Sequence, residues 1–526
     1  MVDEAYNNSS SSSLLPLRWL YEKNLVYMGF GHWMSMDHQN TTWHGVPKRT
    51  IVILLAAALI YVGIWVFFSP QLFASTDEYA YAKNAFLLGE GKLFVDTPEL
   101  YCQNVTLPSG KVASNYPIGK SLQLIPFTWL ARMDALFLAG LLTHLLNFLL
   151  VILILRTKKI DSIWAIAYLA FPAFQWESRT LYAELWLLTF YLGAFLTWIR
   201  GSRFGSTLAG FLLGLAIFVR YDAILGLAAF ALFALVSERH RLIPLLMGAA
   251  VPIAVLLGYN TMVYGGPLTT GYGSISSLAG VGIPLGQLVS ELLTFPLLVF
   301  VTLPFSLWAA YRSKEQRVLF LSLAVLMFLF FVRFYSFWAL GTSITQIFTV
   351  RLRYFIPLLG LLLIPTLEWY AEKWKGISSR LSLSARNKNA LFALAGVLLI
   401  GGTIAIHSTH HRFLEERLAI NSAIHAVIPE NARIIGSADD CMHFLPAVNG
   451  KKYYVDVSKN PALGTHEPTY VVQISYSTQE DNGTPRQGVV DAQRKQLDLF
   501  VQSHQDRLIK VYDGDAVHLT IWRYSP

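Results

Sequence analysis

Long apolar runs constrain this chain more than any other feature of its sequence. A helix needs about 20 apolar residues to cross the hydrocarbon of a membrane, because each residue rises only about 1.5 Å and every backbone polar group must bond within the segment. Many such runs are present, the first beginning at Ile51. Only 14% of the residues are charged, well below the roughly 25% of a soluble domain. The sequence therefore predicts a multi-pass membrane protein.

Eleven runs are candidate membrane spans. They cover residues 51–69, 134–155, 161–176, 181–199, 207–221, 222–237, 242–258, 286–310, 318–333, 354–370 and 390–407. The segment 121–132 is too short to cross, so we expect an interfacial or re-entrant helix there. Almost no loop separates the third span from the fourth, or the fifth from the sixth, which predicts two tight helical hairpins.

The distribution of Lys and Arg predicts the orientation. Nineteen of these residues fall in segments on the same side of the membrane as the N-terminus. Only ten fall in segments on the opposite side, up to residue 353. Because Lys and Arg are retained on the cytoplasmic side when loops are short, we expect the N-terminus inside and the C-terminus outside a bacterial cytoplasmic membrane. The net charge of +8 is then explained by topology, and no nucleic-acid partner is needed.

Three parts follow from this topology. We expect a cytoplasmic tail with an interfacial helix at 1–47, a transmembrane domain at 48–411 that includes a first extracytoplasmic loop at 70–133, and a small extracytoplasmic α/β domain at 412–526. The last part alternates apolar segments typical of strands and helices. The strands are expected near 433–437, 453–457, 469–475, 508–513 and 517–524, and the helices are expected up to 427 and over 491–505.

Charged residues at the predicted outer ends of the spans are candidates for function, because charges beside a membrane are costly and tend to mark functional sites. They are Asp77, Glu78, Lys83, Lys120, Glu177, Arg179, Glu184, Arg220, Asp222, Arg333, Arg351 and Arg353. They come from different hairpins, so a folded bundle can gather them around one outward cavity. There, carboxylates can take a proton from a hydroxyl and arginines can hold a phosphate through forked hydrogen bonds.

Five segments carry a family resemblance: TDEYAYAKNAFLLGEGKLF, SNYPIGKSLQLIPF, SRTLYAELW, FVRYDAIL and RLRYFIPLLG. Together they resemble the polyprenyl-phosphate-sugar glycosyltransferases of the GT-C fold. The branch concerned holds the RgtA/B/C/D-like enzymes, the aminoarabinose transferases and the protein O-mannosyltransferases. The resemblance covers roughly residues 50–410. It implies an α-helical, GT-C-like multi-pass fold, a carboxylate base on the first outer loop, and a lipid-monophosphate sugar donor reached from the membrane.

The resemblance also implies roles for single residues. Asp77 matches the general base, and Glu78 matches a second acid that positions acceptor or donor. The other expected site residues are Tyr116, Lys120, Arg351 and Arg353 for the donor phosphate, and Glu184, Arg220 and Tyr354 for substrate. The implied reaction is an inverting transfer of a sugar to a hydroxyl of a cell-envelope glycan, lipid or protein on the extracytoplasmic face. No nucleotide is released, so no cofactor is expected, and a divalent metal stays open.

Each of these assignments has a structural alternative. The acid pair at 77 and 78 can belong to the first turn of a helix capped by Ser75 or Thr76. Lys120 can extend its ammonium to the interface. Arg220 and Asp222 can form a structural ion pair.

For the whole chain, the main alternative is a transporter or flippase of a lipid-linked substrate. Such proteins typically show inverted repeats and charges deep within their spans, and no repeat is visible in this sequence. Cys102 and Cys441 both fall outside on the predicted topology, where a disulfide can persist, but a buried free Cys is an ordinary core residue, and the sequence favours that alternative. No metal-ligand spacing is present, and we expect His407, His410 and His411 at the membrane interface.

Overall fold

The computed structural model describes residues 47–95, 104–107, 109–130, 133–274, 285–332, 352–380, 385–429, 432–437, 453–456, 468–474, 485–514 and 519–525. Its contacts divide the chain into two units, residues 1–55 and 56–526. Helix α3 (Lys48–Phe67) begins in the first unit and continues into the second. The expected tail helix, both cysteines, Arg333 and Arg351 lie outside the described residues.

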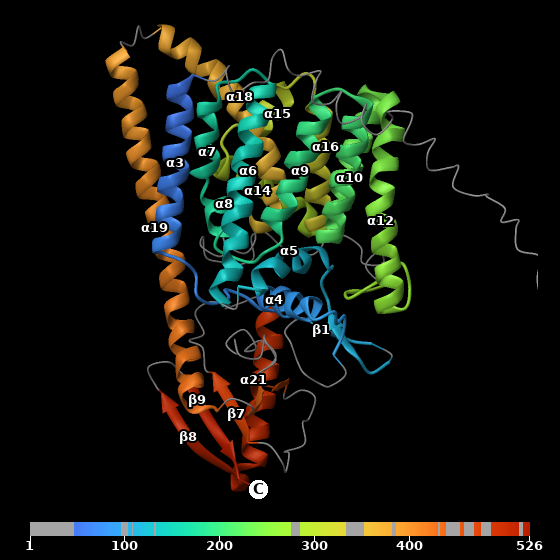
Figure 1. Cartoon of the computed structure of the whole chain (residues 1–526), viewed down its shortest axis with the longest axis vertical. Helices are drawn as coiled ribbons and strands as arrows, with labels where there is room; N and C mark the ends of the chain where they lie inside the picture. Colours follow the sequence, from blue (N-terminus) through green and yellow to red (C-terminus); the bar gives the residue numbers. More distant parts are fainter. Residues whose placement is uncertain are drawn as a thin grey trace, which may run out of the picture. The chain divides into compact units, whose positions relative to one another are not determined.

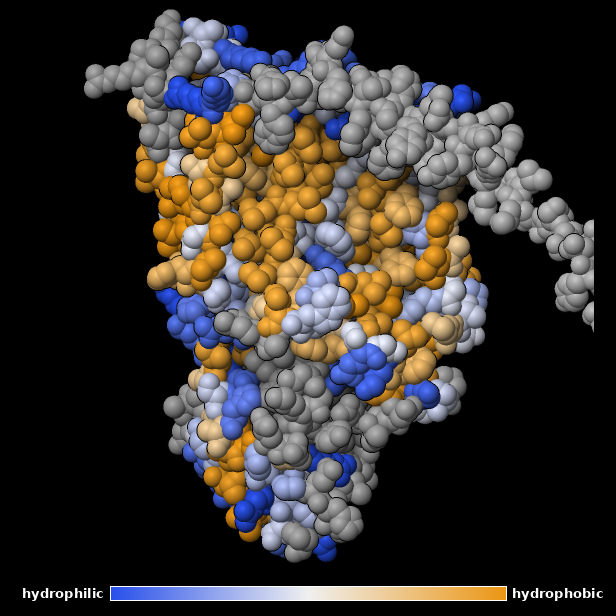
Figure 2. Space-filling model, viewed as in Figure 1, coloured by the Kyte–Doolittle hydropathy of each residue, from blue (hydrophilic) through white to orange (hydrophobic). Residues whose placement is uncertain are grey.

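Apolar helices make up most of the second unit (Figure 1). Besides α3, the long ones are α6 (Leu138–Thr157), α9 (Glu184–Ile199), α10 (Arg203–Val219), α11 (Ile224–Ser237), α12 (Leu242–Tyr264), α14 (Leu285–Thr302), α16 (Arg317–Phe331), α18 (Ile356–Arg380) and α19 (Ala385–Val427). Helix α9 packs against α6 and α10, and α10 packs against α12. Figure 2 shows a broad apolar band over this helical part.

These helices confirm the expected fold class of a helical membrane protein with a small C-terminal sheet. Within the described ranges, four helices are long and apolar enough to cross a membrane, or five if one bent pair counts as a span. Another four apolar helices are shorter, at 10 to 17 residues. The number of eleven spans therefore stays a prediction.

Two expected spans are broken at prolines. Residues 161–176 do not form one helix but three short ones, η3 (Ser162–Ala165), α7 (Ile166–Leu169) and α8 (Pro172–Glu177). Phe171 is extended, with ψ 117°, because a residue that precedes proline is pushed out of the helical region. Likewise, α14 is followed after Pro304 by α15 (Ser306–Arg312), with a bend of 93°. The expectation of a continuous helix was wrong at both places.

The expected first outer loop folds into two short helices and a hairpin. Helix α4 (Thr76–Gly89) packs against α5 (Gly119–Thr128), and strands β1 (Asn104–Thr106) and β2 (Val112–Ser114) pair between them. A Cβ added to Gly119 would lie 2.5 Å from the backbone oxygen of Phe218, near the end of α10. Only glycine allows this close approach, which fixes α5 against the helix end that precedes Arg220.

The C-terminal sheet confirms the predicted α/β pattern. Strands β5 (Arg433–Gly436), β6 (Tyr453–Asp456), β7 (Thr469–Ile474), β8 (Leu508–Gly514) and β9 (Leu519–Tyr524) lie in the order β6-β5-β7-β9-β8, with α21 (Pro485–Ser503) before β8. β5 is parallel to β6 and β7, and β9 is antiparallel to β7 and β8. Val471, Leu497 and Leu508 belong to the core. Helix α19 passes residue 411 without a break, and the domain boundary there stays a prediction.

Candidate active site

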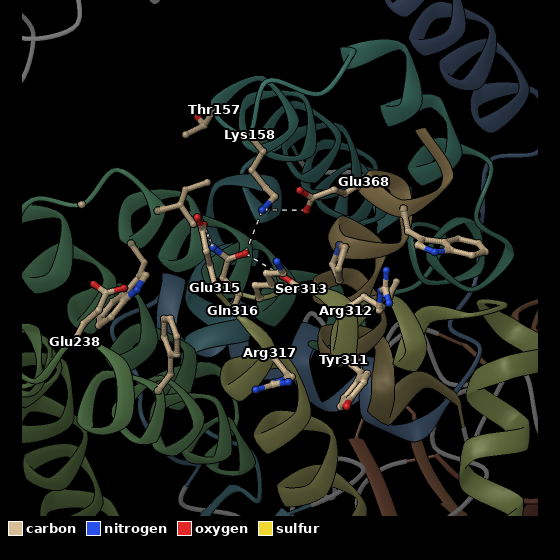
Figure 3. A pocket seen from close by; sticks show the side chains of 18 of the residues that line it. Thr157, Lys158, Glu238, Tyr311, Arg312, Ser313, Glu315, Gln316, Arg317 and Glu368 are labelled. Carbon is tan, nitrogen blue, oxygen red and sulfur yellow. Dashed lines mark hydrogen bonds and ion pairs between the residues drawn. The ribbon is translucent and has the colours of Figure 1, made fainter. Parts of the chain in front are cut away.

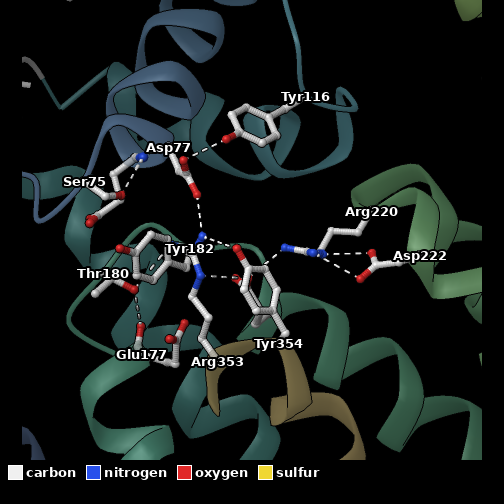
Figure 4. Close-up of polar contacts among 12 residues, drawn as sticks. Ser75, Asp77, Tyr116, Glu177, Thr180, Tyr182, Arg220, Asp222, Arg353 and Tyr354 are labelled. Atoms are coloured by element: carbon white, nitrogen blue, oxygen red, sulfur yellow. Dashed lines mark hydrogen bonds and ion pairs between the residues drawn. The ribbon is translucent and has the colours of Figure 1, made fainter. Parts of the chain in front are cut away.

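Asp77 lies in the first turn of α4, and both of its carboxylate oxygens are bonded. Oδ1 accepts a hydrogen bond from the Tyr116 hydroxyl at 2.7 Å, and Oδ2 accepts one from Arg353 Nη2 at 2.7 Å. Figure 4 shows Asp77 between these two side chains. The Asp77 side chain is 20% exposed and that of Arg353 is 10% exposed. The carboxylate is thus oriented by two donors while part of it stays accessible.

Arg353 is held by aromatic rings as well as by carboxylates. It lies on the short helix η7 (Leu352–Phe355), and its guanidinium carbon is 4.3 Å from the ring centre of Tyr182 and 4.8 Å from that of Tyr354. Nη2 also donates to the Tyr354 hydroxyl at 2.9 Å. Nε lies 3.8 Å from Glu184 Oε1 and has no hydrogen-bond partner among the described residues. Stacking on tyrosine keeps the planar guanidinium in one orientation.

Arg220 forms a second, fully bonded cluster. Its Nη1 donates to Glu184 Oε1 at 2.7 Å, while Nε and Nη2 donate to the two oxygens of Asp222 at 2.9 and 3.1 Å. The expected ion pair of Arg220 with Asp222 is therefore confirmed. Glu184, buried at the start of α9, lies between Arg220 and Arg353. One carboxylate thus links both arginines of the site.

Glu78 is completely buried and holds backbone rather than side chains. Its oxygens accept hydrogen bonds from the amide of Ala74 and from that of Leu181, both at 2.9 Å. Ser75 caps α4 by accepting from the Glu78 amide at 3.4 Å, so the capping geometry considered for this acid pair is present. Burial raises the pKa of Glu78 to about 7, against the two backbone donors, which lower it.

Lys120 and Glu177 are buried near these groups. Lys120 is 1% exposed and donates to Gln123 Oε1 at 2.8 Å. The alternative in which it extends to the interface is wrong, because its ammonium points inward. Burial lowers the pKa of Lys120 to about 8, and Glu184, Glu177 and Glu78 oppose that shift. Burial likewise raises the pKa of Glu177 well above its usual range, and its Oε2 has no hydrogen-bond partner among the described residues.

The structure thus brings most of the expected site residues together. Asp77, Tyr116, Arg353, Tyr354, Glu184 and Arg220 form one connected set of contacts (Figure 4). Glu78 and Lys120 are buried, and their side chains hydrogen-bond to groups outside this set. The roles expected for these residues stay predictions.

Arg179 belongs elsewhere. It is buried, donates to the backbone oxygen of Phe68, and lies 3.0 Å from Nδ1 of His407. His407 and His410 are fully buried where α19 packs against α8, and His410 meets the ring of Trp176. Their expected position at the membrane interface stays a prediction. Arg179 therefore ties the end of α3 to α19.

Two contributors had no clear signal in the sequence. Tyr182 was one of many tyrosines near predicted helix ends, and only the fold places it over Arg353. Glu177 stood among the outer charges, but its burial beside Lys120 and Glu184 depends on the break before α8.

No family model matches the sequence, and no curated protein matches it. Two solved structures of ArnT from Cupriavidus metallidurans are similar over 90% of this chain and 97% of theirs. The one bound to undecaprenyl phosphate has a TM-score of 0.54 at 14% identity, and the one in the apo state has 0.53 at 13%. The chain has the GT-C fold.

An oligosaccharyltransferase from Archaeoglobus fulgidus, tethered to an acceptor peptide through a disulfide bond, is less similar. Its TM-score is 0.45 at 14% identity, over 80% of this chain and 68% of the other. The fold assignment rests on ArnT. The match extends over 97% of the ArnT chain. The resemblance inferred from short sequence segments is thus confirmed as a fold.

Proposed function

We propose that this chain is an inverting membrane glycosyltransferase. It moves a sugar from a polyprenyl-phosphate donor to a hydroxyl of a cell-envelope glycan, lipid or protein at the extracytoplasmic face. The observation that carries this proposal is Asp77, a partly exposed carboxylate oriented by Tyr116 and paired with Arg353. A carboxylate at hydrogen-bond distance from a hydroxyl accelerates attack about 10²- to 10⁴-fold by taking its proton. The GT-C fold, shared with a protein bound to undecaprenyl phosphate, supports a donor of that class.

In the proposed reaction, the acceptor oxygen bonds to the anomeric carbon as the bond from that carbon to the phosphate oxygen breaks. The acceptor proton goes to Asp77, and the lipid phosphate leaves with the bonding electrons. Attack opposite the leaving group inverts the anomeric centre. The growing negative charge on the phosphate is stabilised by a guanidinium already oriented on tyrosine rings, so little reorganisation is needed.

Arg353 connects the two halves of this reaction, because the same Nη2 that would reach a phosphate is bonded to Asp77 Oδ2. A phosphate that takes this donor releases one oxygen of Asp77 to accept a proton. Arg220 has a different role in this proposal. Three of its nitrogens are already bonded to Glu184 and Asp222, so it positions Glu184 behind Arg353.

The test is a single-turnover assay of sugar transfer from radiolabelled polyprenyl-phosphate donor by purified protein. Asp77→Asn keeps the shape of the side chain but cannot take the proton, so transfer should be abolished. It also weakens the bonds to Arg353 and Tyr116, so the melting temperature should fall modestly while the protein stays folded and binds donor at the assay temperature. Asp161→Asn is the matched control, since Asp161 is exposed and only caps η3. Full transfer by Asp77→Asn would refute the catalytic role. Lipid movement without any sugar transfer by the wild type would favour a flippase instead.

A further inference from the structure

A large cavity is lined by charged and aromatic side chains at the C-terminal end of α9 (Figure 3). Its volume is about 1300 Å³, and its walls come from α6, α9, α11, α15, α16, α18 and the segments that connect them. Helix α9 has 16 residues and runs from Glu184 at the candidate active site to Ile199 at this cavity. At 1.5 Å per residue, that is about 24 Å. The cavity is therefore separate from the transfer site.

Cations outnumber carboxylates in the wall. The six cations are Lys158, Arg241, Arg312, Lys314, Arg317 and Lys373, against four glutamates. Lys158 pairs with Glu368 at 3.0 Å, and Arg241 pairs with Glu238. The other four cations have no carboxylate within ion-pair distance among the described residues. Glu315 and Glu372 likewise have no cation within ion-pair distance among the described residues, so the wall carries an excess of two positive charges, which favours an anion.

Aromatic rings support three of these four cations. The guanidinium of Arg312 lies 5.9 Å from the ring centre of Trp308, that of Arg317 lies 5.4 Å from that of Tyr311, and the Lys373 ammonium lies 5.8 Å from the Trp369 ring centre. Trp308 and Tyr311 are themselves about half exposed. Exposed Trp and Tyr at the ends of membrane helices mark the level of the lipid headgroups. The free cations therefore lie at the depth of lipid phosphates.

We propose that this cavity binds the phosphate of an anionic phospholipid, as a lipid site distinct from the site of sugar transfer. Basic pockets between membrane helices suit anionic headgroups, and the planar forks of Arg312 and Arg317 match phosphate oxygens. A cavity of about 1300 Å³ has room for a headgroup with its glycerol, well beyond what a lone phosphate ion would fill. On the predicted topology, the lipid belongs to the cytoplasmic leaflet. The proposal does not depend on the transferase activity.

The test counts retained lipids by native mass spectrometry after extraction of the full chain from nanodiscs. One set of nanodiscs contains phosphatidylcholine alone, and the other contains phosphatidylcholine with phosphatidylglycerol. The wild type should retain phosphatidylglycerol selectively. Arg312→Gln with Arg317→Gln should weaken this retention about 30-fold, since each cation near an anionic surface contributes about fivefold. Lys314→Gln with Lys373→Gln, which removes one cation between α15 and α16 and one on α18, should weaken it similarly.

The matched control is Arg203→Gln with Arg239→Gln, which removes two exposed arginines near the same helix ends but outside the cavity wall. It should retain phosphatidylglycerol like the wild type. Equal loss in this control would show a general effect of surface charge and overturn the proposal. Thermal melts in phosphatidylcholine alone report the folding of every variant. If inorganic phosphate at matched concentration displaced the lipid from the wild type, the ligand would be a free anion, and the lipid assignment would be wrong.

Discussion

Glu78→Gln separates the buried acid of the pair at 77 and 78 from its exposed neighbour. The wild-type carboxylate accepts one hydrogen bond from the Ala74 amide and one from the Leu181 amide, both at 2.9 Å. A glutamine oxygen can replace one acceptor, but its amide nitrogen then faces the other backbone N–H. Glu78 is fully buried, so no water fills the gap. One stranded donor costs about 1–3 kcal/mol of unfolding free energy.

The effect should depend on pH, because Glu78 titrates and glutamine does not. Burial raises the pKa of Glu78 from 4.5 to about 7 in the folded protein. A carboxyl whose folded pKa is raised adds stability that is fully present below pH 4.5 and is lost as the pH rises through 7. At about 1.4 kcal/mol per pKa unit, this shift sets an upper bound of about 3 kcal/mol on the change in unfolding free energy. The stability advantage of the wild type over Glu78→Gln should therefore shrink by up to that amount between pH 4.5 and pH 8.

The assay is thermal unfolding of both proteins in detergent micelles across this pH range. Glu90→Gln is the control on the same helix, because Glu90 is exposed and its ion pair with Lys92 lies at the surface, where such pairs contribute at most about 1 kcal/mol. If the difference in melting temperature between wild type and Glu78→Gln stayed constant from pH 4.5 to pH 8, the inference that burial dominates the pKa of Glu78 would be refuted. If Glu78→Gln lowered the melting temperature no more than Glu90→Gln does, the stabilising role of the two backbone hydrogen bonds of Glu78 would be refuted.

Three further predictions concern the site and its scaffold. Arg353→Lys should raise the donor concentration needed for half-maximal transfer, because a point charge cannot bond phosphate and stack on Tyr182 as a planar fork does; unchanged donor dependence would contradict the phosphate assignment. Gly119→Ala should lower the melting temperature, since its Cβ would lie 2.5 Å from Phe218 O, whereas Gly89→Ala, whose Cβ meets nothing closer than 3.6 Å, should not; equal melts would contradict the close packing. A cysteine placed at 478–486 should react with an impermeant thiol reagent in intact spheroplasts, and labelling only after lysis would reverse the topology.

Patterns along the chain predict what depends on neighbours in sequence. Apolar runs predicted the helices, and alternation predicted the five C-terminal strands with boundaries within a few residues. The breaks at Phe171 and after Pro304 were also readable locally, since proline restricts the residue before it. They were missed because span length outweighed the proline signal. The segment after the break at Phe171 reaches the site, since the Leu181 amide donates to Glu78 on α4.

Pairings between distant segments are a different matter. Topology predicted that charges at the outer helix ends would meet, and Asp77, Glu184, Arg220, Asp222 and Arg353 do, whereas Arg179 lies elsewhere. Topology could not say which of them would pair. Asp77 and Arg353 are 276 residues apart, and a single sequence holds no record of that contact. The same limit applies to the packing around His407 and His410. Their burial follows from the packing of α19 on α8, which no local pattern encodes.

The capping and catalytic interpretations of the acid pair are compatible, because the structure divides the two tasks between residues. Ser75 supplies the N-cap oxygen, and Glu78 fastens the start of α4 to the backbone at Leu181. The helix end is therefore held without the carboxylate of Asp77, whose oxygens turn to Tyr116 and Arg353 instead. Asp77→Asn should then lose transfer with only the modest loss of stability that follows from weakening its bonds to Tyr116 and Arg353. Glu78→Gln should instead lose stability and keep transfer. The opposite outcome is that Asp77→Asn has a much lower melting temperature and loses transfer only in proportion to the unfolded fraction. Both acids would then serve only to stabilise the start of α4.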